Sequence, residues 1–467
     1  MVSGDVTESK APEATTNKTL ILVIVCVVCF FISFMGVGLN IAIPAIGKEF
    51  SANAILLNWV VTLTILTSGV FSIPCGRIAD MFGLKKLFII GLSIVLPFTI
   101  LTVFSNSIYM LMVCQVIQSV GLAIIFATSA AILVAVFPSQ ERGKALGFNV
   151  GVLYFGFSIS PLVCGFLTEQ VGWRSIYLIA VPGCLIGLIL LLWKVKQEWV
   201  HSRGEKFDYP GAVIFGLSLI FIMYGFSVLP ELHGFFLLLA GIIGMIIFFK
   251  WESRTNSPVF DISILRNNRV FLFSNLTAFI SYSAVAAVAY LLSLYLQYNK
   301  GLTPGAAGLV LAVQPVIQAA LSPLSGWLSD KIEPRIVVSV GMGLTCAGLV
   351  PFAFVTASTP LIWIVVPLLI LGMGFGIFSS PNTNAIMSSV SDRNLGVASA
   401  VSGTMRTLGI LFSMAVTMIL MNIFVGRVVI TPEHYASFLV CLRVAFAIFT
   451  ALCFTGIFFS LSRGKVR

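Results

Sequence analysis

Apolar segments of about 20 residues recur along the chain, and each is long enough to cross the roughly 30 Å hydrocarbon layer of a bilayer as a helix. They extend from Thr19 to Leu461 and are separated by short polar stretches. Of the 467 residues, 58% are hydrophobic and 9% are charged, whereas soluble domains carry about 25% charged residues. We therefore expect an all-α polytopic membrane protein.

The segments predict fourteen spans, and the first lacks a small-residue cleavage site, so we expect it to be retained. The expected spans are 19–46, 57–76, 86–104, 108–137, 145–168, 174–193, 210–228, 234–250, 270–297, 305–327, 335–356, 360–389, 396–425 and 434–461. We expect the following domains: a tail at 1–18, a six-helix bundle at 19–193, a linker with two extra helices at 194–269, a second six-helix bundle at 270–461 and a tail at 462–467.

Basic residues collect on one side of these spans. If the N-terminus is cytoplasmic, 21 of the 27 Lys and Arg residues lie in cytoplasmic segments. Lys and Arg are enriched in cytoplasmic loops of membrane proteins, so the net charge of +10 indicates orientation and not nucleic-acid binding. We expect a multi-pass protein of the cell (cytoplasmic) membrane with both termini in the cytoplasm.

A short motif occurs twice. Gly76-Arg-Ile-Ala-Asp80 follows the second span, and Gly326-Trp-Leu-Ser-Asp330 follows the tenth. Each copy follows the second helix of a six-helix set if the seventh and eighth spans are an insertion, which predicts two parallel halves with a substrate site between them.

The full first copy, Gly76-Arg-Ile-Ala-Asp80-Met-Phe-Gly83-Leu-Lys85-Lys86, resembles the loop signature of the major facilitator superfamily. Six further segments are similar to its fourteen-helix drug:proton antiporter branch (multidrug efflux type): Asn40 to Pro44, Trp59 to Thr62, Gly172 to Arg174 with Pro182, Phe207 to Gly211, Tyr295 to Gln297, and Gly403 to Gly409. The resemblance implies the major facilitator fold in a 6+2+6 arrangement.

Two motifs have implied mechanical roles. Gly76, Asp80, Gly83, Lys85, Lys86, Arg142 and Asp330 form the expected gating motif, in which Asp80 meets a basic residue or a helix N-terminus in one conformation only; Arg142 is a candidate partner. Gly156, Ser160, Pro161 and Gly165 of the fifth span resemble the antiporter motif. Pro161 bends the helix, and the small residues permit close packing.

The resemblance implies proton coupling, but two positions depart from the family pattern. Met35 stands where the first helix commonly has Asp, and Gln115 where the fourth usually has Arg. Moreover, none of the 17 acidic residues lies inside an expected span, whereas proton coupling usually uses membrane carboxylates. The coupling ion therefore stays open.

Polar residues inside the spans are candidates either for lining a substrate cavity or for bonding between helices. The expected cavity residues are Asn40, Gln115, Gln118, Tyr154, Gln297, Gln314, Gln318, Asn384 and Arg406. Arg406 is the strongest, because its helix matches a central position in the family. For Arg443 we favour a structural bond or snorkelling to the interface.

The residues give no sign of an enzyme. The histidines lie in separate loops and no Walker-type phosphate loop is present, so we expect no metal, no cofactor and no direct use of ATP. We expect a monomeric secondary transporter that exports a small amphiphilic molecule, a drug-like compound or metabolite, by alternating access. The alternatives are an organic-anion uniporter or exchanger, and a non-transporting membrane sensor.

Overall fold

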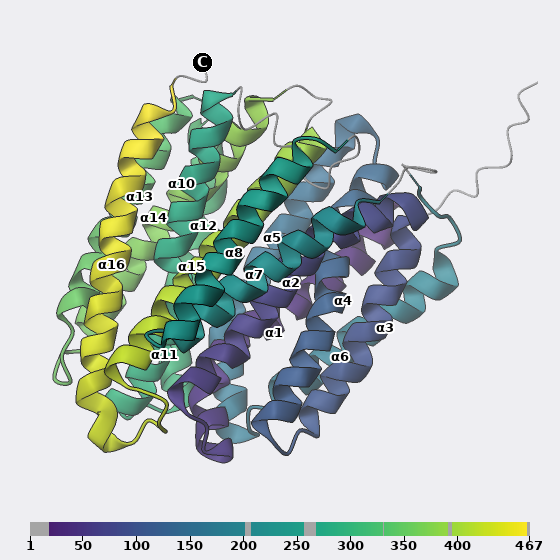
Figure 1. Ribbon diagram of the computed structural model, residues 1–467. Coiled ribbons are helices and arrows are strands. Elements are labelled where there is room, and N and C mark those ends of the chain that lie inside the picture. The colour runs from purple at the N-terminus through teal and green to yellow at the C-terminus, as the bar shows by residue number, and fades with distance from the viewer. Residues whose placement is uncertain (1–17, 201–206, 256–267, 330, 391–394, 465–467) are drawn as a thin grey trace, which may run out of the picture.

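The computed structural model describes residues 18–200, 207–255, 268–329, 331–390 and 395–464. Within these ranges the chain is helical without strands, and fourteen spans are long and apolar enough to cross a membrane. The predicted all-helical fold with fourteen transmembrane helices is thus confirmed. Figure 1 shows long helices running roughly side by side through the molecule.

The first six helices pack mainly against one another. They are α1 (Lys18–Phe50), α2 (Ala54–Phe82), α3 (Leu84–Val103), α4 (Ile108–Val136), α5 (Ser139–Gln170) and α6 (Ser175–Lys194). Extensive contacts join α3 to α4, α2 to α4 and α1 to α5. We call this group the first half.

The last six spans form the second half. They comprise α10 (Arg269–Val285) continued by α11 (Val288–Leu294) and a π-helical turn (Tyr295–Asn299), then α12 (Pro304–Ser329), α13 (Pro334–Leu349) with a 3-10 turn (Val350–Phe354), α14 (Ile362–Ser388), α15 (Leu395–Phe424), and α16 (Tyr435–Ser462) preceded by a 3-10 turn (Pro432–His434). Two seams join the halves: α5 packs against α12, and α2 packs against α15. The exact domain boundaries stay a prediction.

The two inserted helices, α7 (Tyr209–Val228) and α8 (Leu232–Glu252), pack against each other. Of the two, α7 contacts both α2 and α15, so the pair lies across the seam between the halves, as Figure 1 shows in front of the bundle.

Local sequence explains where several helices begin. The side chains of Asn53, Ser107, Asp208 and Asn268 each accept a hydrogen bond from a backbone N–H in the first turn of the following helix. These are the residue types that cap free N–H groups best. An apolar run preceded by such a cap therefore specifies both the helix and its first residue.

The ninth span is broken in its middle, between α10 and α11. The N–H of Ala287 donates to Ser413 Oγ of α15 at 3.1 Å. A buried backbone group inside a bilayer needs such a partner. The α15 hydroxyl therefore stabilises the break.

Several helices are longer than the predicted spans and include acidic residues in their terminal turns. α1 extends to Phe50 and includes Glu49, and α2 extends to Phe82 and includes Asp80. The expectation that no acidic residue lies in a span is thus wrong for terminal turns. The physical reason is that a helix continues past the hydrocarbon layer, where its last turn meets water.

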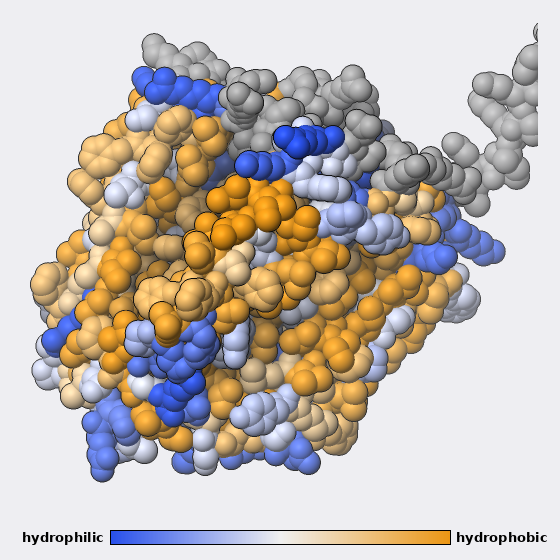
Figure 2. Space-filling view, in the orientation of Figure 1, coloured by the Kyte–Doolittle hydropathy of each residue, from blue (hydrophilic) through white to orange (hydrophobic). Residues whose placement is uncertain are grey.

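Apolar side chains cover most of the middle of the molecule in Figure 2, and hydrophilic side chains gather at its two ends. We call the end where α1 begins and α16 ends the basic end; the loop with Lys85 and Lys86 lies there. The other end, which carries Glu49 and Arg174, is the opposite end.

Candidate functional site

A cavity of about 700 Å3 lies between the two halves, in the α5–α12 seam. It is lined by Gly147, Val150, Gly151, Tyr154, Phe155, Ser158, Ile159 and Leu162 of α5, Ala312, Val316, Ala319, Ser322 and Pro323 of α12, and Ser380 of α14. Most of these residues are small or apolar. The lining residues lie along the middle of both helices, on the basic-end side of Gly165 and Gly308.

Two hydrogen bonds cross the seam beside this cavity. The Tyr154 hydroxyl lies 3.2 Å from Ser379 Oγ of α14. Ser158 Oγ donates to the Pro315 carbonyl of α12 at 2.9 Å. Polar groups of both halves therefore meet at the inner wall of an otherwise apolar cavity.

Next to this link lies an intramembrane arginine. Tyr282 of α10 lies beside Arg406 and Ser379, which both interact with its hydroxyl, and Tyr154 adds a further electrostatic interaction. The Tyr282 ring packs edge-on against Phe375, with 5.1 Å between ring centroids. The Arg406 side chain is exposed. We call Tyr154, Tyr282, Ser379 and Arg406 the central cluster.

The central cluster lies inside the membrane-spanning helices, displaced from their middle toward the basic end. Arg406 follows the first residue of α15, Leu395, by a length of about 16 Å at 1.5 Å per residue. Ser379 precedes the last residue of α14, Ser388, by about 14 Å on the same basis. Both residues are farther from the other end of their helix, Phe424 of α15 and Ile362 of α14.

The charge of the cluster is positive. In the ranges that the structure describes, each Asp and Glu lies in a loop or within two residues of a helix end. Arg406 therefore has no carboxylate near it among those residues. A guanidinium has five donors and no acceptor, so its remaining donors are available to water or to an anionic or hydrogen-bond-accepting ligand.

Three further predicted cavity residues lie within the first half. Gln115 Nε2 donates to the Tyr177 hydroxyl at 2.9 Å, and Gln118 Nε2 donates to Thr99 Oγ1 at 2.5 Å; both side chains are buried. Asn40 Nδ2 makes a long bond of 3.4 Å to its own helix. The structure thus joins Gln115 and Gln118 to neighbouring helices and does not bring them to the α5–α12 cavity, so their substrate role stays a prediction.

The remaining predicted cavity residues belong to the second half. Gln297 donates to the Ile41 carbonyl of α1 at 3.0 Å, which is a bond between the halves near the opposite end. Asn384 donates to Ser329 Oγ at 3.1 Å. Gln314 and Gln318 are half-buried on α12, and their backbone carbonyls lie against glycines of α14.

The predicted gating motif forms the turn between α2 and α3 at the basic end. Gly83 has φ +116°, and a Cβ there would lie 2.6 Å from the Glu198 carboxylate, which explains the need for glycine. The same carboxylate accepts hydrogen bonds from the N–H groups of Lys85 at 2.9 Å and Lys86 at 3.1 Å. The segment after α6 therefore caps the first turn of α3.

The other motif residues are placed less tightly. Gly76 faces Ala127 of α4 at ordinary contact distance, and Asp80 is half-buried. Arg142 Nε donates to the Phe137 carbonyl at 3.0 Å. Pairing between Asp80 and Arg142 stays a prediction, and Asp330 lies outside the described residues.

The predicted motif of the fifth span joins α5 to two helices. Toward α1, Ser160 Oγ donates to the Phe34 carbonyl at 2.5 Å, and a Cβ on Gly156 would lie 3.1 Å from the Phe30 carbonyl. These contacts fix α5 inside the first half.

Toward α12, the same motif closes the seam near the opposite end. A Cβ on Gly165 would lie 2.6 Å from the Pro304 carbonyl, and a Cβ on Gly308 would clash with the Pro161 carbonyl. Glu169 Oε2 accepts a hydrogen bond from the Gly305 N–H at 3.0 Å. Because backbone meets backbone here, no side chain of any size fits between the helices.

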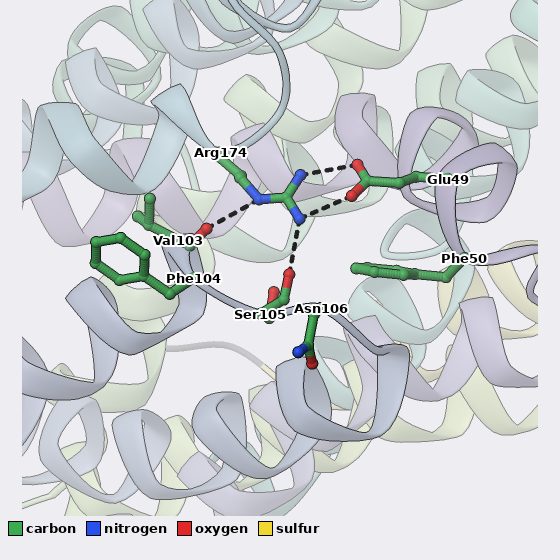
Figure 3. A pocket seen from close by; sticks show the side chains of 7 residues that line it. All are labelled: Glu49, Phe50, Val103, Phe104, Ser105, Asn106 and Arg174. Atoms are coloured by element: carbon green, nitrogen blue, oxygen red, sulfur yellow. Dashed lines mark hydrogen bonds and ion pairs between the residues drawn. The ribbon is translucent and has the colours of Figure 1, made fainter.

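A second pocket, of about 400 Å3, lies at the opposite end around Arg174 (Figure 3). The Arg174 guanidinium forms an ion pair with Glu49 at 2.7 Å and donates to the Val103 and Ser105 carbonyls. Trp173 also donates to Glu49. These bonds tie three loops of the first half together, so this arginine is structural.

The predicted cavity residues include Tyr154 and Arg406 but not the other two members of the central cluster, Tyr282 and Ser379. Tyr282 has the signal of a polar side chain in an apolar span. Ser379 has none, because serine is common in membrane helices, where it bonds to its own backbone or to a neighbour.

Comparison with known proteins now decides the family. The Major Facilitator Superfamily profile matches residues 24–414. The chain belongs to this superfamily. Its members are transporters, so the chain is a membrane transport protein of that superfamily.

Similar proteins from this superfamily cover nearly the whole chain. The riboflavin transporter RibZ of Clostridioides difficile is 28% identical, over 94% of this chain and 96% of RibZ. The multidrug resistance protein Stp of Mycobacterium tuberculosis is 26% identical, over 86% of this chain and 75% of Stp. Among solved structures, the peptide transporter POT in complex with alafosfalin superposes with a TM-score of 0.71 at 16% identity, over 95% of this chain and 94% of POT.

Proposed function

We propose that this major facilitator protein is a secondary transporter that exports a small amphiphilic molecule by alternating access. The observation that carries the proposal is the central cluster, a positively charged polar site inside the membrane where the halves meet. A cavity reaches it from one side, and the α5–α12 seam is packed backbone to backbone on the other. Such a site, opened to each side in turn, is what alternating access requires.

The basic end is proposed to face the cytoplasm. The support is the excess of Lys and Arg in the loops at that end. With this orientation the closed part of the α5–α12 seam lies on the external side of the cavity, as expected of a state that loads a molecule for export. The multidrug resistance protein among the relatives supports the export direction.

The proposed substrate is anionic or neutral. Arg406 provides a charge that favours anions, and the hydroxyls of Tyr154, Tyr282 and Ser379 provide hydrogen bonds. A permanent cation would be repelled, since no carboxylate lies near the cluster among the described residues. The same observation favours one alternative function, an organic-anion uniporter or exchanger.

Proton coupling is part of the proposal only through the family resemblance. Met35 and Gln115 occupy the positions where Asp and Arg are usual. Here Met35 Sδ lies 3.7 Å from Gln118 Nε2, and Gln115 bonds to Tyr177. An imposed pH gradient separates the functions: a proton antiporter accumulates substrate against a gradient, whereas a uniporter only equilibrates it.

The decisive experiment uses purified protein in proteoliposomes with an imposed pH gradient. The probes are the aromatic anion 1-anilinonaphthalene-8-sulfonate and the cation ethidium. We expect transport of the anion and weak transport of the cation. Arg406→Gln should weaken anion affinity by roughly tenfold or more, because hydrogen bonds to charged groups contribute about 1.5–3 kcal/mol, whereas Arg406→Lys should retain part of the affinity.

Arg443→Gln is the matched control. Arg443 is also an arginine within a span, but its Nε donates to the Val355 carbonyl at 2.6 Å within the second half, so its substitution should affect both probes alike. Equal losses for both probes in Arg406→Gln, or efficient ethidium export by the unmodified protein, would contradict the anion preference.

A further inference from the structure

The two seams between the halves differ in what covers them. Along the α2–α15 seam, α7 packs against both helices. A Cβ on Gly216 of α7 would lie 3.0 Å from Val70 of α2, and Asn422 of α15 donates to the Leu229 carbonyl just after α7. Phe215 and Leu219 of α7 share a buried apolar cluster with residues of α2 and α15. The inserted helices therefore separate this seam from lipid.

The α5–α12 seam has no such cover among the described helices. Toward the opposite end it is closed by glycines, but toward the basic end it holds the cavity. Several of the lining side chains are exposed: Phe155 by 57%, Leu162 by 40% and Val316 by 48%. At this depth of a membrane protein, an apolar side chain that no protein covers faces the hydrocarbon layer. The cavity is therefore a groove that opens sideways into the bilayer.

Small residues create the groove. Gly147 and Gly151 on α5 have nothing within 4 Å of the position where a Cβ would stand, and Ala312 and Ala319 of α12 also belong to the lining. Its volume of about 700 Å3 lies within the range of drug-sized binding sites, about 300–1,000 Å3.

The inner end of the groove is polar and continuous with the central cluster. Tyr154 and Ser380 belong to its lining, and Tyr154 bonds to Ser379. Through Tyr282 the chain of contacts reaches Arg406. An occupant of the groove therefore has apolar walls along its length and hydrogen-bonding hydroxyls at one end, beside the cluster that contains Arg406.

We propose that the α5–α12 groove is a lateral portal, through which an amphiphile with an apolar body and an anionic or hydrogen-bond-accepting group passes from the bilayer to the central cluster. This inference rests on the proposed transport function and adds the route and the shape of the substrate. The apolar body keeps the contact with apolar surroundings that it had in the lipid, so moving into the groove costs little. The polar group exchanges the bilayer interface for the hydroxyls of the cluster and the charge of Arg406.

The first test locates the occupant directly. The full protein is placed in nanodiscs of zwitterionic lipid with a photoreactive naphthalene sulfonate that carries an alkyl diazirine, and the cross-linked peptides are mapped. We expect cross-links concentrated on α5 at 147–162 and on α12 at 312–323, reduced by excess 1-anilinonaphthalene-8-sulfonate. Cross-links spread evenly over lipid-exposed helices would overturn the portal, as would a retained lipid in the groove that the probe does not displace.

The second test fills the groove. Gly151→Trp and Ala319→Trp place a large side chain in the hollow, and we expect groove cross-linking and anion transport to fall by at least fivefold. Phe166→Trp on α5 and Leu324→Trp on α12 are matched controls, since both residues are exposed by more than half and lie outside the lining; they should stay within twofold of the unmodified protein.

The outcomes separate the portal from the proposed function. If the unmodified protein transports the anion and both groove-filling variants transport it equally well, the portal is refuted and the proposed function stands. If the groove shows displaceable cross-links but the protein transports neither probe, the proposed function is refuted and only a binding site remains. Adding lipid lowers the mole fraction of the probe in the bilayer at constant total concentration. A transport rate that follows the mole fraction supports passage from the membrane, and a rate that follows the total concentration contradicts it.

Discussion

Each of the two seams between the halves is formed by one helix from each half, but the seams differ in what covers them and in how closely their helices pack. On the α2–α15 side the inserted helices α7 and α8 lie across the junction, so its apolar residues form a buried cluster of their own. On the α5–α12 side the helices touch backbone to backbone near the opposite end and are held apart by a cavity toward the basic end. A covered seam can move without exposing polar groups to lipid, whereas an uncovered one can exchange molecules with it.

The difference also assigns roles to glycine. In the α5–α12 seam, Gly165 and Gly308 face backbone atoms that have no freedom to move aside. Over the other seam, Gly216 of α7 faces a methyl group of Val70 of α2, and a side chain can rotate. The first contact is therefore a strict geometric condition for closure, whereas the second is a tight contact that a side-chain rotation can relieve.

Orientation determines which leaflet the groove meets, and it gives the largest expected signal. His233 is exposed at the opposite end, in the first turn of α8. In His233→Cys we expect nearly complete labelling by an impermeant maleimide added outside intact cells, because this end is predicted to be external. The native cysteines are buried except for the half-buried Cys346, and the unmodified protein serves as the control. Protection of the new cysteine would place the groove in the other leaflet or remove the two-helix insertion as a membrane pair.

We expect a single added methyl group to prevent closure of the α5–α12 seam. Gly308→Ala places a Cβ against the Pro161 carbonyl, and overpacking of this kind costs about 1–3 kcal/mol. We expect transport to fall about tenfold while the protein still folds, as checked by its melting temperature in detergent. Gly216→Ala, where α7 packs over the covered seam, is the matched control and should stay within twofold. Equal effects of the two substitutions would show that the seams do not differ in tolerance.

The basic end of the covered seam is probed by Asp80, near the end of α2. Asp80→Asn removes a charge whose interactions change when the halves move at that end, so we expect turnover to slow several-fold. Substrate affinity should be nearly unchanged, because the residue lies far from the midplane. Initial rates and equilibrium binding of the same probe separate the two effects. A large loss of binding with normal switching would assign Asp80 to the substrate site instead.

The fold was largely predictable because each of its signals is local. The apolar runs specify the spans, and the loop charges predict their orientation. Residues such as Asn53 and Asp208 cap the helices that follow them. The repeated Gly76 and Gly326 motifs predicted two halves. In a bilayer, where most backbone groups are bonded within their own helix, such local information goes far.

The site was predictable only in part, because it depends on contacts between distant helices. Arg406 and Tyr154 were expected at the site and belong to the central cluster. Gln115 and Gln118 have the same sequence signal, a polar residue in a span, yet they bond to neighbouring helices. The sequence leaves open whether an amide lines a cavity or joins two helices, since either arrangement satisfies its hydrogen bonds. Ser379 became a candidate only because α14 brings it to Tyr154.

The smallest expected effect concerns the contacts that hold α7 and α8 over the α2–α15 seam. At the opposite end Glu231, before α8, lies 3.4 Å from Arg427, just beyond α15, and both side chains are half exposed. Exposed ion pairs contribute about 0–1 kcal/mol, so Glu231→Gln should lower the melting temperature by no more than about 2 °C and leave transport unchanged. Asn422→Ala removes the donor to the Leu229 carbonyl and should lower it further, because this bond is partly buried. Glu231→Gln alone could instead lower the melting temperature strongly, and high salt could have the same effect on the unmodified chain. In that case α7 and α8 would be held in place mainly by charge. The covered seam would then depend on an exposed ion pair rather than on the apolar packing of α7.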